Sequence, residues 1–305
     1  MNQTTTPAVF DGHNDALLKL FRAGGVSAAE KFVAGMDGAI DAQKARAGGF
    51  GGGFFAVYVP SPVDLEVKFE EMTKPKYDLP LPSAIDWPEA QAVVMAQSAI
   101  LFELERMGAL RVCRNAADIR AALADGIIAA IYHIEGAEAI DPDLHTLDTL
   151  YQAGLRSIGP VWSRPTIFGE GVPFRYPATG DIGNGLTEAG VRLVKRCNQL
   201  GIMIDLSHLN TAGFWDVARH SDAPLVATHS NVNAICPHSR NLTDDQMRPI
   251  RDSGGIAGLN LAVCFLRPDG RDMADTGMDI LLAHLDHMLE IMGADHVGMG
   301  SDFDG

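Results

Sequence analysis

The chain is short of basic residues, and this shortage excludes two kinds of partner. Its 305 residues carry 24 Lys and Arg against 39 Asp and Glu, which gives a formal net charge of −15 at pH 7. A nucleic-acid backbone or an anionic membrane surface would be repelled by that charge. We therefore expect neither nucleic acid nor a membrane among the partners of this protein.

Cysteine is also scarce. The four cysteines form no C-x-x-C pair and stand far apart, at positions 113, 197, 236 and 264. A chain of this length buries about three quarters of its unfolded surface and needs no disulfide, so we expect buried free thiols in a reduced compartment. The first residues lack the basic and apolar regions of a secretory signal, and no apolar run is long enough to span a membrane. Together these absences predict a cytoplasmic protein.

What the sequence contains is a regular alternation of short apolar runs and helical patterns, within an ordinary globular composition of 47% hydrophobic residues. Most of the apolar runs are continuous, as in a parallel sheet that is covered on both faces. The predicted strands lie at residues 8–10, 54–59, 127–132, 155–162, 202–206, 224–228, 255–260 and 296–300. Eight strand–helix units joined by right-handed crossovers predict a (β/α)8 barrel of the TIM type.

Two insertions interrupt this pattern, at residues 60–82 after the second strand and 163–185 after the fourth. Both leave from the C-terminal ends of strands, where barrel enzymes build their sites, so they either wall a pocket or decorate the surface. Helix ends are visible elsewhere, such as Thr243 with Gln246 in the pattern of a capping box. We expect one metallo-hydrolase domain over residues 1–305, with the closing helix of the barrel not present in this chain.

Histidines and carboxylates follow five of the predicted strands at their C-terminal ends. They are His13 with Asp15, Glu135, His208, His229 and Asp302. A lone histidine at a strand end is usually a core residue. In a barrel, however, these ends converge on one face, and five such ends are hard to explain as core filling.

The spacing of these residues predicts a centre for two metal ions. His13 and Asp15 are two residues apart, so they point to the same side of an extended segment and can hold one ion. His208 and His229 can hold a second, and the two oxygens of Glu135 can bridge both. This ligand chemistry suits zinc or a similar divalent metal. Two ions about 3.5–4 Å apart would lower the pKa of a shared water enough for it to attack a carbonyl at neutral pH.

The sequence also resembles the renal (membrane) dipeptidase family, binuclear zinc metallopeptidases of the amidohydrolase-like barrels. The resemblance runs along the whole chain in the family's order. It implies that the five residues above are metal ligands and that the substrate is a dipeptide with a free C-terminal carboxylate, including the L-Xaa-D-Xaa type. The matching segments are FDGHND at 10–15, IEGAEAID at 134–141, GLRSIGPVW at 154–162, IDLSH at 204–208, ATHS at 227–230, CPHSRNLTDD at 236–245 and GSDFDG at 300–305.

The resemblance implies further roles that spacing alone does not give. Arg240 matches the family arginine that binds the free carboxylate, and the planar guanidinium suits a carboxylate bidentately. Asp302 matches the acid–base residue, and with the bridging Glu135 it is the predicted catalytic residue. The sequence departs from the family at Trp162, which stands where mammalian members carry a histidine that polarises the scissile carbonyl. Trp162 is therefore expected to contact substrate, and Arg164 is a candidate for the missing positive group.

Two other functions are open at this point. One is a different binuclear hydrolase, such as a lactonase, a phosphotriesterase or an N-acyl-amino-acid hydrolase, although these usually carry H-x-H rather than H-x-D after the first strand. The other is a metal-bound barrel that has lost catalysis. The sequence does not define an oligomeric state, although homodimers are common among such barrels.

Overall fold

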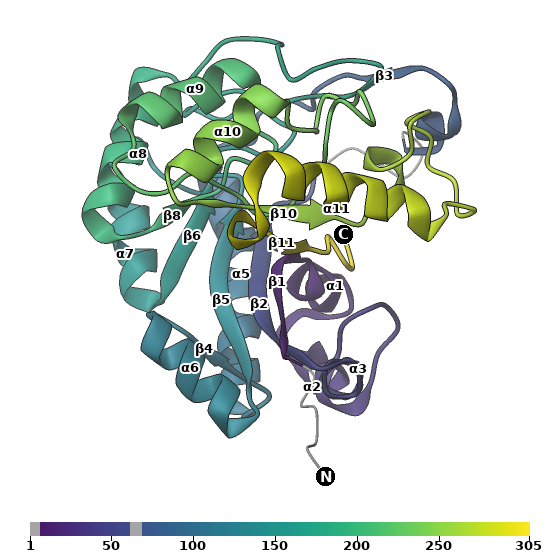
Figure 1. Cartoon of the computed structure of the whole chain (residues 1–305). Coiled ribbons are helices and arrows are strands. Elements are labelled where there is room, and N and C mark those ends of the chain that lie inside the picture. The colour runs from purple at the N-terminus through teal and green to yellow at the C-terminus, as the bar shows by residue number, and fades with distance from the viewer. Residues whose placement is uncertain (1–6, 62–68) are drawn as a thin grey trace.

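The structure is a computed structural model, and it describes residues 7–61 and 69–305. Its main sheet is parallel and runs in the order β8-β6-β5-β2-β1-β11-β10-β9. A parallel bridge between Asp205, just after β8, and Val226 at the start of β9 joins the two ends of that sheet. The sheet is thus closed into a barrel of eight strands with helices outside it, and the predicted (β/α)8 fold is confirmed (Figure 1).

Each barrel strand overlaps one of the predicted apolar runs. β1 extends further than predicted and therefore contains His13. β2 begins earlier than predicted, inside a glycine cluster. Glycine is needed there, because a side chain at Gly52 or Gly53 would collide with the backbone of Ala129 or Asp11. The strands are β1 (Val9–Asn14), β2 (Phe50–Tyr58), β5 (Ile128–Glu135), β6 (Leu155–Gly159), β8 (Met203–Ile204), β9 (Val226–Ala227), β10 (Ile256–Asn260) and β11 (Val297–Gly300).

The helices pack around this barrel. Thr243 caps α10 in a reciprocal capping box with Gln246, as predicted. The α-helices are α1 (Ala16–Arg22), α2 (Ala29–Ala34), α3 (Ala42–Gly48), α5 (Trp87–Arg106), α6 (Ala116–Asp125), α7 (His145–Ala153), α8 (Glu188–Leu200), α9 (Thr211–His220), α10 (Asp244–Asp252) and α11 (Met278–Met292). Short 3-10 helices are η1 (Gly25–Ala28), η2 (Glu70–Thr73), η3 (Val263–Phe265) and η4 (Ala294–His296).

The two insertions form one structure, which the sequence does not reveal. β3 (Tyr77–Leu79) of the first insertion pairs antiparallel with β7 (Phe174–Tyr176) of the second. The pair is tied to the loop after β10, because the Tyr77 hydroxyl donates to Gly270 O and the Tyr176 hydroxyl donates to Pro268 O, each at 2.6 Å. Residues 62–68 of the first insertion, like residues 1–6, lie outside the described part. A further short strand, β4 (Leu110–Val112), pairs with the first half of β5 and was not predicted.

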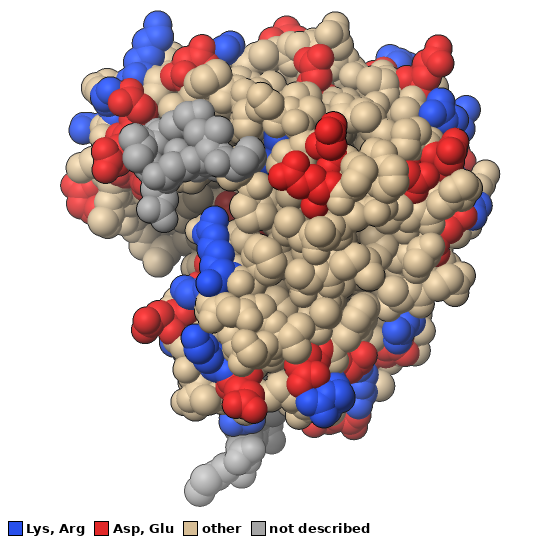
Figure 2. Space-filling model, turned by 180° about the vertical axis from the view of Figure 1, so that it is seen from behind, with Lys and Arg blue, Asp and Glu red and all other residues tan. Residues whose placement is uncertain are grey.

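Three further features concern the cysteines, the helices and the surface. The four cysteines are buried and free. Among the described residues, no helix combines the length and the apolar character that a membrane span requires. On the face shown in Figure 2, charged side chains of both signs are scattered mainly around a broad uncharged area, so this face presents no basic patch for a phosphate backbone.

Candidate metal centre

The barrel brings the predicted metal-binding side chains together at one mouth. The Glu135 Oε1 atom is at their centre, 3.7 Å from His13 Nε2, 3.1 Å from His208 Nε2 and 3.3 Å from His229 Nε2. Asp15 Oδ2 lies 3.3 Å from His13 Nε2. All five residues are buried. They come from β1 and the residue that follows it, from the end of β5 and from the turns after β8 and β9.

These side chains form two overlapping groups whose ligand atoms lie within 4.8 Å of one another. We call His13, Asp15 and Glu135 the acidic set, and Glu135, His208 and His229 the histidine set. They are the two groups that spacing predicts, with Glu135 shared between them. The described part of the chain contains two more groups of this kind. One combines His13, His229 and Asp205, and the other is at the surface around Asp141.

The atoms at the centre have the environment of a metal site. His13 Nε2 and Glu135 Oε1 are buried and have no hydrogen-bond partner among the described residues. A buried polar atom without a partner costs free energy, so such atoms need an explanation. Imidazole nitrogens and carboxylate oxygens are ligands of zinc and of related divalent ions. The residues present therefore fit such a metal.

The two sets differ in charge. Although burial alone would lower it, the carboxylates of Glu135, Asp15 and Asp302 raise the pKa of the His13 imidazole to about 10. Burial raises the pKa of the Glu135 carboxyl in turn. In the histidine set, burial and nearby positive charge hold the pKa values of His208 and His229 well below their usual range, so both imidazoles are neutral. A neutral imidazole is the form that binds a metal.

Hydroxyl groups hold the two imidazoles of the histidine set from behind. Ser163 Oγ lies 2.9 Å from His208 Nδ1, and Thr228 Oγ1 lies 2.8 Å from His229 Nδ1. Thr228 also donates to the buried carboxylate of Asp205, at 2.6 Å. Such outer contacts orient the ligands of a metal. Sequence analysis missed these three residues, because serine and threonine are common and Asp205 lies within an apolar run.

Asp302 lies at the edge of the acidic set. Its Oδ1 atom is 4.0 Å from His13 Nε2, and its side chain is about one fifth exposed, at 21%. Asn260, at the end of β10, donates from Nδ2 to Asp302 Oδ2 at 2.9 Å. The backbone of Asp302 is in the left-handed region, with φ of 60°, which is uncommon for a residue other than glycine. Asp302 is thus beside the predicted ligands and open to solvent, as a proton carrier requires.

Arg240 is buried beside the histidine set. Its guanidinium donates to the carbonyl oxygen of His229 at 3.2 Å and lies over the ring of Phe265. The Nε atom has no partner among the described residues. Burial lowers the pKa of Arg240, and the charges of Asp302 and Glu135 oppose that shift. The structure therefore holds a cation with an unused donor next to the centre.

Trp162 forms part of an aromatic wall, and Arg164 is turned away from the centre. The Trp162 ring lies 5.7 Å from the His208 ring and packs against Tyr58 and Phe174. Arg164 is fully buried. Its guanidinium donates to Glu138, Ser61 Oγ and Val59 O. Arg164 is therefore committed to the scaffold and does not replace the positive group that Trp162 lacks.

The insertions wall the site and do more than decorate the surface. Phe174 on β7 lies 6.4 Å from the His208 ring and stacks on Phe265. A narrow cleft beside Trp162 and Ser163 has an otherwise apolar lining, which is formed by Phe69, Leu79, Pro80, Pro82, Pro173 and Phe174. This lining comes largely from the two insertions.

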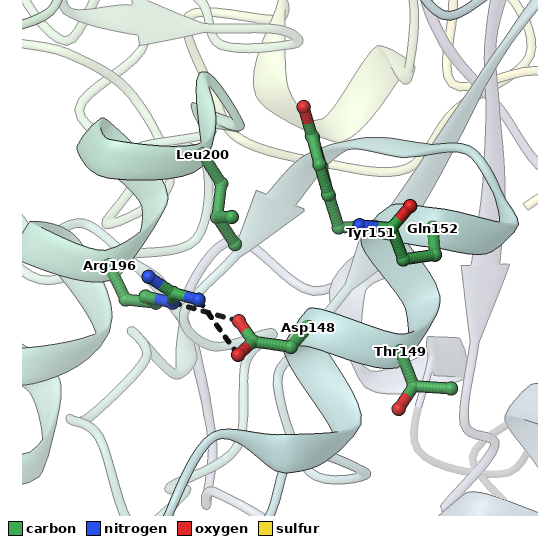
Figure 3. A pocket seen from close by; sticks show the side chains of 6 residues that line it. All are labelled: Asp148, Thr149, Tyr151, Gln152, Arg196 and Leu200. Atoms are coloured by element: carbon green, nitrogen blue, oxygen red, sulfur yellow. Dashed lines mark hydrogen bonds and ion pairs between the residues drawn. The ribbon is translucent and has the colours of Figure 1, made fainter.

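A larger hollow of about 390 Å³ lies elsewhere, on the outside of the barrel between α7 and α8 (Figure 3). Its charged groups already satisfy one another, since Arg196 pairs with both carboxylate oxygens of Asp148 at 2.8 Å. It contains none of the predicted site residues. The predicted site residues are thus at the mouth of the barrel and not in this hollow.

Comparisons with known proteins agree with this geometry. The model of the membrane dipeptidase family (peptidase family M19) matches residues 3–305. A metallopeptidase from Rhodobacter sphaeroides, solved with a phosphinate mimic of the dipeptide L-Ala-D-Ala, has 53% identity and a TM-score of 0.94 over 99% of this chain and 87% of its own. A dipeptidase described as a metallopeptidase of family M19 has 53% identity and a TM-score of 0.93, over 99% and 86%. An uncharacterised protein from Acinetobacter calcoaceticus is 37% identical, over 92% of this chain and 89% of its own.

Proposed function

We propose a finer function from the premise that this chain belongs to the membrane dipeptidase family and is a metal-dependent dipeptidase. The protein hydrolyses dipeptides with a free C-terminal carboxylate, and it uses two zinc ions. One ion is held by the acidic set and the other by the histidine set. The substrates include dipeptides of the L-Xaa-D-Xaa type. This part of the proposal is supported by the mimic of L-Ala-D-Ala bound to the Rhodobacter sphaeroides metallopeptidase.

The main support for this proposal is the position of the Glu135 carboxylate. Its Oε1 atom is buried, has no hydrogen-bond partner among the described residues and faces the imidazole nitrogens of three histidines. Cations on either side of this oxygen would satisfy it and the facing nitrogens together. When bound, a pair of divalent ions supplies polarisation of a carbonyl group and acidification of water at neutral pH.

Arg240 sets the requirement for a short substrate with a free carboxylate. Its buried guanidinium has an unused Nε donor, and a carboxylate is the group that pairs best with it. A substrate that places its C-terminal carboxylate on Arg240 presents the amide bond beside that carboxylate to the neighbouring centre. The enzyme therefore removes the last residue of a dipeptide and does not cut within a chain.

Asp302 moves the proton. Its Oδ2 atom is occupied by Asn260, which leaves Oδ1 towards His13 and the centre. In this position Asp302 takes the proton of the attacking water and passes it to the leaving amine. Its partial exposure lets the product amine leave with that proton.

The aromatic wall selects the N-terminal side chain. The cleft beside Trp162 is narrow and mainly apolar, and Arg164 contributes no charge to it because its donors are used by Glu138, Ser61 and Val59. We therefore expect small apolar residues, such as alanine, to be preferred at the N-terminal position.

Hydrolysis by chelator-stripped protein, before and after addition of zinc, tests this function. The substrates are L-Ala-D-Ala, L-Ala-L-Ala and L-Ala-D-Ala amide, in which the free carboxylate is removed and the scissile bond is kept. We expect zinc to restore cleavage of the free dipeptides and the amide to be a poor substrate. Equal rates on dipeptide and amide would contradict the role of Arg240, and inactivity of the zinc-loaded protein on all three would contradict the proposed function.

A further inference from the structure

A chain of three buried side chains runs away from the histidine set. Thr228 Oγ1 lies 2.8 Å from His229 Nδ1 on one side and 2.6 Å from Asp205 Oδ2 on the other. Asp205, Thr228 and His229 are all at most 3% exposed. The proton positions in this chain follow from the number of donors and acceptors that it contains.

Asp205 fixes the direction of the first hydrogen bond. Its Oδ1 atom accepts from the backbone N–H groups of Ser207 and Thr228, at 3.0 and 2.9 Å. With Oδ2 accepting from the Thr228 hydroxyl, both oxygens of Asp205 act as hydrogen-bond acceptors. Two imidazole nitrogens lie farther away, since His133 Nε2 is 3.7 Å and His229 Nδ1 is 4.0 Å from Oδ2. The single hydroxyl proton of Thr228 is therefore directed to Asp205.

The second hydrogen bond must then run in the same direction. Because the Thr228 hydroxyl has given its one proton to Asp205, Oγ1 can only accept from His229 Nδ1–H. The proton of the neutral imidazole is on Nδ1, and the lone pair is on Nε2. This Nε2 atom lies 3.3 Å from Glu135 Oε1 and 3.2 Å from His208 Nε2. The lone pair thus faces the centre of the histidine set.

The backbone around Thr228 leaves it little freedom to move. Its carbonyl oxygen lies so close to Gly12, Gly258 and Gly300 that a side chain at any of these three positions would collide with it. The Ser207 hydroxyl oxygen also accepts a hydrogen bond from the backbone N–H of His229, at 3.1 Å. The chain of hydrogen bonds is therefore held in register by the packing of the barrel.

The other two histidines have no such arrangement. His208 Nδ1 faces the Ser163 hydroxyl at 2.9 Å, but the structure pairs no carboxylate with that hydroxyl. His13 Nδ1 has no hydrogen-bond partner among the described residues. Among the described residues, His229 is thus the one of the three imidazoles whose Nδ1 atom is connected to a carboxylate through a hydroxyl group.

We infer that Asp205 and Thr228 are positioning residues, which fix His229 as the Nδ1–H tautomer so that its Nε2 atom is presented to a metal ion. This inference rests on the proposed function, because the histidine set is taken to hold that ion. Outer partners of a metal-binding histidine change metal affinity by about 10- to 100-fold. Neither residue touches the substrate in this account.

Asp205→Asn tests the direction of the chain. The amide oxygen must stay at the Oδ1 position, where it accepts from two backbone N–H groups, so the amide nitrogen faces Thr228. The hydroxyl then gives its proton to His229 Nδ1, and the imidazole proton is moved to Nε2, where it blocks the metal. We expect Asp205→Asn to lower zinc affinity by about 10- to 100-fold and Thr228→Ser, which keeps the hydroxyl, to leave it unchanged.

The double variant Asp205→Asn/Thr228→Val distinguishes this account from loss of structure. Removal of the hydroxyl frees the imidazole from the wrong tautomer, so the double variant is expected to bind zinc more tightly than Asp205→Asn alone. A purely structural role predicts that the second substitution makes binding weaker. Zinc affinity is measured by competition with a chromophoric chelator, and circular dichroism of the metal-free proteins checks the fold.

The tautomer itself is read in metal-free protein from the ring nitrogen shifts of histidines labelled with ¹⁵N, with His229→Gln used to assign the signal. We expect Nδ1–H in the wild type and Nε2–H in Asp205→Asn. The same tautomer in both proteins, or a double variant that binds as weakly as Asp205→Asn, would overturn the inference. Failure of the wild type to bind zinc would instead overturn the proposed function, because the tautomer measurement requires no metal.

Discussion

The acidic set and the histidine set share Glu135 but are built in opposite ways. In the acidic set, three carboxylates surround His13 and raise its pKa to about 10, and His13 Nδ1 has no partner among the described residues. In the histidine set, both imidazoles are neutral and are held from behind by Ser163 and Thr228. One set attracts a cation by charge, and the other is organised by hydrogen bonds. The difference shows that one centre can prepare its ligands by two separate means.

Glu135 belongs to both sets, so its replacement should impair both of them. Glu135→Gln removes one negative charge from each set and is expected to lower both metal content and kcat/KM, the latter by on the order of 10³-fold, since the polarisation by metal is lost. Metal analysis and hydrolysis of L-Ala-D-Ala measure the effect. Glu89→Gln, the same change on the exposed face of α5, is the control. Retention of two metals by Glu135→Gln would contradict the bridging role.

Asp302 lies beside the acidic set but is not one of its predicted ligands, so its replacement should separate proton transfer from metal binding. Asp302→Asn is expected to lower kcat by about 10²- to 10⁴-fold while the metal content stays unchanged, since only the proton transfer is lost. Asp286→Asn on the exposed face of α11 is the matched control. Loss of a metal ion together with activity would show that Asp302 is a ligand of the acidic set.

Arg240 lies on the side of the histidine set and should affect binding more than chemistry. Arg240→Ala is expected to lower kcat/KM for L-Ala-D-Ala by roughly 10- to 100-fold, mainly through KM, because a charged hydrogen bond to the substrate is lost. The rate on L-Ala-D-Ala amide should hardly change. Arg248→Ala, on the exposed face of α10, is the control. An equal loss on dipeptide and amide would assign Arg240 to the scaffold.

The last prediction concerns the pH dependence of metal binding. Because the pKa of His13 is raised to about 10, this imidazole is protonated at pH 7 in the metal-free protein, and a metal that binds to the acidic set must displace that proton. The affinity of this set should therefore rise with pH between about 7 and 10, and Glu135, whose pKa burial raises to about 8, contributes to the rise because it also gives up its proton there. The neutral imidazoles of the histidine set have no proton to lose in this range.

Calorimetric titration with zinc in buffers of different ionisation enthalpy measures the protons released. The variant His229→Gln weakens the histidine set and leaves the acidic set intact. We expect this variant still to release protons when it binds zinc, as the wild type does. If His229→Gln released no protons on binding zinc, the protons would come from the histidine set, and their assignment to the acidic set would be wrong.

The convergence of the predicted ligand residues could be expected from the sequence because a barrel places such residues by a simple rule. Each follows an apolar strand, and the ends of parallel strands meet at one face. The supporting residues could not be found in this way. Thr228 and Ser163 belong to common residue types, and the role of Asp205 depends on hydrogen bonds across the neighbouring strands β8 and β9.

The structure of the insertions is a part of the fold that could not be predicted from the sequence. β3 and β7 have three residues each and are paired across about one hundred residues of chain, so no local pattern marks them. Arg164 shows how a local argument can mislead. Its neighbour Trp162 suggests a replacement for a lost positive group, but Glu138, on another loop, binds the guanidinium and turns it into the scaffold.

Anomalous diffraction from zinc-loaded crystals would test the central claim most directly. We predict two zinc peaks about 3.5–4 Å apart, one beside His13 and Asp15 and one beside His208 and His229, with the Glu135 carboxylate between them. A single peak, or zinc bound at the surface group around Asp141 with none beside Glu135, would contradict the two-set account of this dipeptidase.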